Sequence, residues 1–141
     1  IDQGATQALP IFKVQTRLQS GLVEVALAKF IADKTNWRNM LKGQSDVLDL
    51  KAATTELLPQ IEEKLDELAE LFGATAIEKL DEDVVTLDYP VDEYPTKISS
   101  FNFDKAPEVS GVLKGIKGQY LIFDTGVINI RKFTSYEITL S

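Results

Sequence analysis

The spacing of apolar residues changes along the chain from a pattern typical of helices to one typical of strands. Residues 21–33 and 46–72 repeat apolar side chains every three or four positions, which predicts amphipathic helices. Residues 10–18 alternate apolar and polar side chains, which predicts one strand ahead of the first helix. After residue 83 the period becomes two, and turn residues interrupt it repeatedly. The pattern predicts an α+β fold, with an α-rich N-terminal part and an antiparallel β-rich C-terminal part that forms a small sheet or barrel.

Capping residues indicate where the predicted helices begin and end. Ser20 stands where the N-cap of helix 21–33 is expected. Thr35 is placed to cap a second, short helix that contains Trp37 and stops at Gly43. We expect both helices to turn their apolar stripe toward a core.

The long acidic stretch 46–72 contains a proline inside its helical pattern. Because Pro59 cannot donate to the preceding turn, it either starts the main helix or kinks a longer one. Gly73 is the expected stop. A charged connector follows at 78–83, so we place the α-rich part at residues 1–80 and the β part at 81–141. The strands expected in the β part are 84–88, 97–103, 109–113, 119–124, 127–133 and 136–140.

Charge is concentrated in the middle of the chain. The 141 residues carry 15 basic and 22 acidic side chains, a net charge of -7. Residues 51–100 hold thirteen acidic and four basic residues, whereas each flank has a net charge of +1. The two flanking segments can therefore bind an anion, and the middle segment can bind a basic partner.

Two residue types that carry much enzyme chemistry are missing. The chain has no cysteine and no histidine, which excludes disulfides, Cys or His nucleophiles and the usual zinc sites. Any chemistry must use carboxylates, lysine, tyrosine, hydroxyl groups or a hard cation. The chain starts at Ile1 without methionine and shows no signal peptide or membrane span, so we expect a cytoplasmic fragment of a longer protein.

Basic side chains surround the tryptophan, and a second group lies near the C-terminus. Cations beside an aromatic ring are what phosphate neutralisation and base stacking require. The alternatives are a core position for Trp37 and a glycine-rich turn at 114–118 between two strands. The predicted nucleic-acid-binding residues are Arg17, Lys34, Trp37, Arg38, Lys42, Lys114, Lys117, Arg131 and Lys132.

The triplet Asp124-Thr125-Gly126 matches the active-site motif of aspartic proteases. A dimeric protease of that kind needs most of its fold after the triplet, and only fifteen residues follow Gly126. A hairpin turn between two strands is the favoured interpretation.

Several blocks of the chain resemble a bacterial family of unknown function. The resemblance covers nearly the whole chain and implies an upstream Cys-rich, zinc-binding segment that this chain lacks. The blocks include Ile1-Asp2-Gln3-Gly4-Ala5, Ser20-Gly21-Leu22-Val23-Glu24, Ala32-Asp33-Lys34-Thr35-Asn36-Trp37-Arg38, Lys114-Gly115-Ile116-Lys117-Gly118-Gln119-Tyr120-Leu121 and Asn129-Ile130-Arg131-Lys132.

A weaker resemblance to GIY-YIG endonucleases concerns the order of a strand and a helix near the start of the chain. It implies that Glu24 is the catalytic carboxylate that holds Mg²⁺ in the intact protein. The tyrosine-bearing hairpin and the helix arginine of that superfamily are absent, so we expect this chain alone to be inactive and to hold no cofactor. The alternative for Glu24 is a favourable charge near a helix N-terminus.

Two functions from different classes follow from these observations. The leading hypothesis is a nucleic-acid-associated fragment that binds DNA or RNA and belongs to a nuclease-like or nucleic-acid-binding module. The alternative is a protein-interaction or scaffolding module in which the acidic helix docks a basic partner. The acidic residues expected to carry that contact are Glu62, Glu63, Asp66 and Glu67.

Overall fold

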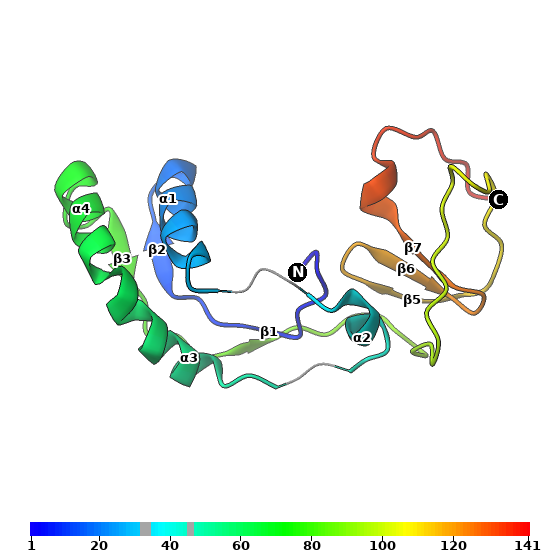
Figure 1. Ribbon diagram of the computed structural model, residues 1–141, viewed down its shortest axis with the longest axis horizontal. Helices are drawn as coiled ribbons and strands as arrows, with labels where there is room; N and C mark the ends of the chain where they lie inside the picture. The colour runs from blue at the N-terminus through cyan, green and yellow to red at the C-terminus, as the bar shows by residue number, and fades with distance from the viewer. Residues whose placement is uncertain (32–34, 45–46) are drawn as a thin grey trace. The chain divides into compact units, whose positions relative to one another are not determined.

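The computed structural model describes residues 1–31, 35–44 and 47–141. The chain folds into two compact units, and each unit draws on segments from both sides of residue 80. Unit 1 comprises Ile1–Thr6, Thr35–Asp46 and Leu87–Ser141, and unit 2 comprises Gln7–Lys34 and Val47–Thr86. Each unit is therefore described by itself, with the helices and strands labelled as in Figure 1.

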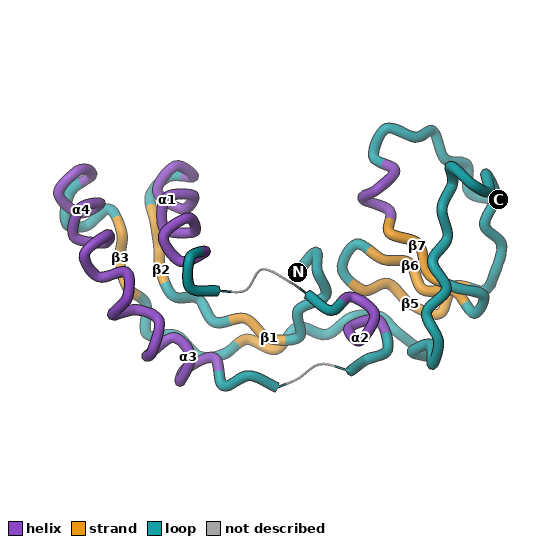
Figure 2. The backbone as a smooth tube through the Cα atoms, viewed as in Figure 1, coloured by secondary structure: helices purple, strands orange, loops and turns teal. Residues whose placement is uncertain are grey.

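Unit 2 contains two short antiparallel strand pairs that join its two chain segments. Strand β1 (Gln7–Ala8) pairs with β4 (Val85–Thr86), and β2 (Phe12–Val14) pairs with β3 (Ile77–Lys79). In the second pair Val14 lies opposite Ile77. Figure 2 shows β2 and β3 between α1 and α4. Strand β3 begins just before the stretch predicted as a charged connector and occupies its first two residues. That prediction was wrong there, because β2 supplies the partner strand from the start of the chain.

Helices flank the β2–β3 pair of unit 2. Helix α1 (Arg17–Ala28) packs on β2, and α4 (Glu62–Phe72) packs on β3 and against α1. Helix α3 (Leu50–Leu57) leads into α4 through the 3₁₀ turn η1 (Leu58–Ile61). The buried apolar residues of this unit are Val23, Ala26, Ile61, Leu68 and Ala76.

Helix α1 begins four residues earlier than the sequence predicts. Thr16, and not Ser20, is the N-cap: its side chain accepts from the backbone N–H of Gln19, and the Gln19 side chain accepts from the N–H of Thr16. Arg17 is therefore the first residue of the helix rather than the end of a strand. The helix ends at Ala28, and residues 32 and 33 of the predicted range lie outside the described part of the chain.

Pro59 interrupts the long acidic helix as predicted. It lies in the first turn of η1, where its missing N–H costs no helical hydrogen bond. Gly73 ends α4 with φ of 98°, a conformation that favours glycine. Of the two alternatives for Pro59, the structure has the interruption of a longer helical stretch, between α3 and α4, and the predicted stop is confirmed.

Unit 1 is built on a three-stranded antiparallel sheet with the order β5-β6-β7. The strands are β5 (Leu113–Lys117), β6 (Tyr120–Phe123) and β7 (Val127–Asn129), and the 3₁₀ turn η2 (Ile130–Phe133) follows directly. The short helix α2 (Trp37–Leu41) packs on the sheet. The buried cluster consists of Met40, Leu41, Tyr120, Ile122 and Val127.

The α+β class is confirmed, and the antiparallel C-terminal part is a small sheet. Two stretches predicted as strands, 97–103 and 136–140, contain none. The first makes only an isolated bridge from Ser100 to Val127, because alternating residues do not by themselves supply a pairing partner. No helix in the described part of the chain is long and apolar enough to cross a membrane.

Candidate nucleic-acid interface

Helix α2 presents the tryptophan of the chain at the edge of the unit 1 core. Asn36 caps this helix by accepting from the backbone N–H of Asn39 at 3.2 Å, so the predicted cap, Thr35, was one residue off. The Trp37 ring stacks on Tyr120 of β6, with 6.0 Å between ring centroids and 6° between planes. The guanidinium carbon of Arg38 lies 4.4 Å from the Trp37 ring centroid, within cation–π range. Trp37 is thus partly buried and packs against the core, the alternative that the sequence left open.

A pocket of about 340 Å³ opens beside this aromatic pair. It combines two aromatic side chains with amide, hydroxyl and guanidinium groups. Its lining residues are Gln3, Thr35, Trp37, Met40, Gln119, Tyr120 and Arg131. Predicted residues from α2 and from the C-terminal group, Trp37 and Arg131, therefore meet at one place although they are far apart in the sequence.

The N-terminal segment is fastened along this pocket. The backbone N–H of Gln119 donates to the carbonyl of Asp2 at 2.8 Å, and a β-carbon on Gly118 would lie 2.3 Å from that same carbonyl. The Tyr89 hydroxyl lies 2.8 Å from the carbonyl oxygen of Ala5 and 3.1 Å from that of Ile1. Burial raises the pKa of Tyr89, with further contributions from the Asp2 carboxylate and Tyr94, so the hydroxyl keeps its proton as a donor.

Two of the predicted cations, one at the pocket and one outside its lining, are partly neutralised. Arg131 follows the Asn129 cap of η2 and pairs with Asp2 at 2.8 Å. Lys114 of β5 pairs with Glu93 at 3.4 Å. Any anion bound by Arg131 must therefore compete with a carboxylate already in place.

Lys117 cannot reach a nucleic acid in this fold, which corrects its assignment. Its side chain is 1% exposed. The ammonium donates to the carbonyl of Met40 at 3.2 Å and to the Tyr94 hydroxyl at 3.3 Å, and it lies 4.9 Å from the Tyr94 ring centroid. A buried ammonium satisfied by a carbonyl and an aromatic residue is a core element that joins β5 to α2.

The other predicted basic residues occupy different places. Arg38 and Lys132 are exposed and Lys42 is half-buried in unit 1, whereas Arg17 is exposed in unit 2. Lys34 lies outside the described residues. The structure therefore groups only part of the predicted set at one pocket.

The glycine-rich stretch 114–118 is mostly strand and only at its end a turn. Strand β5 runs through it to Lys117, and the backbone N–H of Ile116 donates to the carbonyl of Pro90 at 2.9 Å. Gly115 is required by a close approach, because a β-carbon there would lie 2.7 Å from the Cα of Val91. The predicted turn was wrong at these positions, because Gly115 pairs with Ile122 of β6 on one side and forms an antiparallel bridge with Val91 on the other.

The Asp124-Thr125-Gly126 triplet forms the predicted hairpin turn. Phe123 and Gly126 bond to each other across the turn, with N–H to carbonyl distances of 2.8 and 3.3 Å. The Asp124 carboxylate accepts from the backbone N–H of Val112 at 2.9 Å. The carboxylate thus has a structural role in holding the chain beside the turn.

Glu24 is exposed in the middle of α1. It therefore lies away from the helix N-terminus, and the residues that the structure describes form no metal-binding geometry around it. No group of three or more carboxylates lies close enough to hold a metal ion in the described part of the chain. The predicted role of Glu24 in the intact protein stays a prediction.

Sequence reasoning missed Gln3, Gln119 and Tyr120 as pocket residues. Tyr120 follows the Gly118-Gln119 turn and alternates inward with Ile122, a signal that marks it as a core residue. Nothing in the sequence placed the N-terminal Gln3 beside β6, because that contact depends on tertiary folding.

Comparison with known proteins agrees with the broader of the two resemblances. No curated protein and no solved structure matches the chain. The model of a protein family of unknown function, DUF2797, matches residues 1–138. That match covers nearly all of the chain, both units included, and the chain therefore belongs to the family DUF2797.

Proposed function

We propose that unit 1 binds single-stranded nucleic acid at the pocket beside Trp37. The observation that supports this function is that Trp37, Tyr120 and Arg131 line the same pocket. Aromatic rings beside guanidinium groups are the means by which proteins stack bases and hold phosphates.

The chemistry of the pocket fits one unpaired nucleotide better than a duplex. A volume of about 340 Å³ is within the size of small-ligand pockets and too small for a double helix. The amide groups of Gln3 and Gln119 offer both donors and acceptors to a base edge, whereas a paired base presents only its groove edge. Arg131 can exchange the Asp2 carboxylate for a phosphate, and Arg38 adds a second guanidinium beside the ring.

The acidity of the rest of the chain favours a local contact over a broad electrostatic one. With a net charge of -7, the protein repels long polyanions at a distance. Binding must therefore depend on stacking and on a small number of cations, which predicts weak salt dependence compared with a basic groove protein.

The proposal is tested by titrating labelled single-stranded DNA, single-stranded RNA and duplex DNA into the chain at two salt concentrations. Because Trp37 is the single tryptophan, its fluorescence reports on the pocket directly. We expect micromolar binding of single strands with quenching of Trp37, and weaker binding of the duplex. The double charge reversal R38E/R131E should weaken binding about tenfold or more and flatten its dependence on salt.

The matched control is K97E/K105E, which changes the net charge by the same amount at two exposed residues of unit 1 that do not line the pocket. It should leave the affinity within about twofold. Equal affinity of the wild-type chain and R38E/R131E, or no binding of any nucleic acid at low salt, would refute the proposed function.

A further inference from the structure

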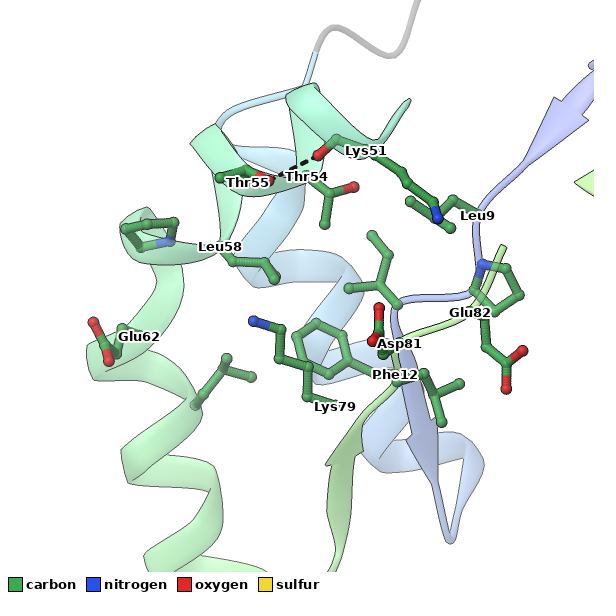
Figure 3. Close-up of a pocket in the computed structure, with 15 residues that line it drawn as sticks. Leu9, Phe12, Lys51, Thr54, Thr55, Leu58, Glu62, Lys79, Asp81 and Glu82 are labelled. Carbon is green, nitrogen blue, oxygen red and sulfur yellow. Dashed lines mark hydrogen bonds between the residues drawn. The ribbon is translucent and has the colours of Figure 1, made fainter. Parts of the chain in front are cut away.

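Unit 2 contains a larger hollow, of about 560 Å³, that is independent of the pocket in unit 1. It lies between the chain before β2, the end of β3, and the α3–η1 helical segment. In Figure 3 the side chains of Leu58 and Phe12 extend into the same space from different elements. Its apolar wall consists of six half-buried side chains: Leu9, Ile11, Phe12, Leu58, Leu65 and Leu80.

The segment that supplies most of this hollow is strongly acidic, although Lys51 and Lys79 also line it. Residues 47–86 carry eleven acidic and three basic side chains, a net charge of -8. Two of the three lysines are already paired, Lys51 with Asp83 at 2.7 Å and Lys64 with Glu67 at 2.5 Å. The hydrogen bond and the charge of Asp83 raise the pKa of Lys51, and Lys51 lowers the pKa of Asp83.

The carboxylates at the rim of the hollow are available to a partner. Glu62, Asp81 and Glu82 line it and are exposed, and none forms an ion pair with another residue that the structure describes. An apolar wall with a carboxylate rim is complementary to a segment in which apolar side chains alternate with lysine or arginine.

We propose that this hollow docks a basic amphipathic segment of a partner protein. Leucine- or phenylalanine-sized side chains of the segment enter the apolar wall, and its cations meet Glu62, Asp81 and Glu82. The apolar contact gives affinity by removing half-exposed surface from water, and the rim gives orientation and speeds the encounter.

The negative charge of this region excludes two other macromolecules as occupants of the hollow, a nucleic acid and a second copy of this chain. A nucleic acid would bring its phosphates against a region of net charge -8. A second copy of the same face would bring like charges together, which opposes a symmetric dimer at this site.

The test uses the full chain, labelled with ¹⁵N, and a synthetic fourteen-residue peptide with leucine at every third or fourth position and lysine elsewhere. A second peptide replaces each leucine by serine and keeps the charge. We expect the leucine peptide to shift amide signals at residues that line the hollow, and to bind about tenfold or more tightly than the serine peptide.

Two variants locate the contact and have a matched control. E62K/E82K should weaken binding of the leucine peptide about tenfold. E63K/E70K changes the net charge by the same amount at exposed α4 residues outside the hollow, and Glu63 shares the first turn of α4 with Glu62. This control should change the affinity by about twofold at most, because its charges lie away from the docked segment.

A third variant tests the apolar part without changing the charge. T54F places a ring into the hollow from α3, at a half-buried residue of its lining, and should weaken the leucine peptide while leaving the far-ultraviolet spectrum unchanged. The proposal is overturned by equal affinity of the two peptides, by an equal effect of the two double variants, or by no binding at millimolar peptide. Self-association that shifts the same signals would assign the hollow to a second copy and would also overturn it.

Discussion

At the scale of single residues, the basic side chains of unit 1 have different environments although the sequence makes them look alike. Lys114 and Lys117 are three positions apart on the same strand. Lys117 is enclosed by Met40 and Tyr94, whereas Lys114 pairs with Glu93 at the surface. Sequence spacing predicted both as phosphate-binding cations, and burial leaves only Lys114 accessible.

Replacing the buried lysine should destabilise unit 1. K117A removes three methylene groups and an ammonium from the core and takes one of its donors from the Met40 carbonyl, which keeps the backbone N–H of Gly43. We expect the free energy of unfolding to fall by about 2–4 kcal/mol. Urea unfolding followed by Trp37 fluorescence measures the change, because Trp37 lies beside the Met40 core.

The control for this substitution is K114A in the same strand. Its ion pair with Glu93 is largely solvated, so the loss should be about 0.5 kcal/mol or less. A K117A midpoint equal to that of K114A would contradict the structural role assigned to Lys117.

At the scale of elements, the periodic pattern predicted helices well and their first residues less well. The stripe that includes Val23 and Ala26 is buried as expected. The start was misplaced because both Thr16 and Ser20 are good capping residues, and only the position of Gln19 relative to Thr16 completes a capping box.

Removing the observed cap should destabilise unit 2 more than removing the predicted one. T16A loses the bond to the Gln19 N–H and should lower the free energy of unfolding by about 1 kcal/mol. S20A introduces a good helix former inside α1 and should be neutral or stabilising by a few tenths of a kcal/mol, since alanine exceeds serine in helix propensity. Urea unfolding followed by circular dichroism at 222 nm compares the two. A greater loss in S20A would place the helix start at the residue that the sequence predicted.

At the scale of the whole molecule, each unit is assembled from segments that are distant in sequence. The unit 1 core combines Met40 and Leu41 with Ile122 and Val127. In unit 2, β2 needs β3, which lies more than sixty residues later. A division of the chain at residue 80 keeps that strand pair together, but it separates α2 from the sheet with which it shares the unit 1 core.

The C-terminal fragment cut at that position should not fold alone. Residues 81–141 lack the α2 side chains that cover the sheet, whereas residues 1–80 keep the buried residues of unit 2 and lack strand β4 and most of unit 1. We expect the isolated 81–141 fragment to show poor dispersion of its amide signals and no cooperative unfolding. Mixing it with 1–80 should restore part of the dispersion. Cooperative unfolding of the isolated fragment would show that the β part is an autonomous domain.

The sequence by itself determined the α+β class, the helical stretches, a break in the helical pattern at Pro59 and the exclusion of cysteine and histidine chemistry. These features depend on local periodicity, on proline geometry and on composition, which are properties of neighbouring residues. Only the tertiary structure decided that Lys117 is buried, that Gly115 lies in a strand, and that Arg131 meets Trp37 at one pocket. Periodicity shows which face of an element is apolar, but the partner that covers this face is fixed by packing between distant segments.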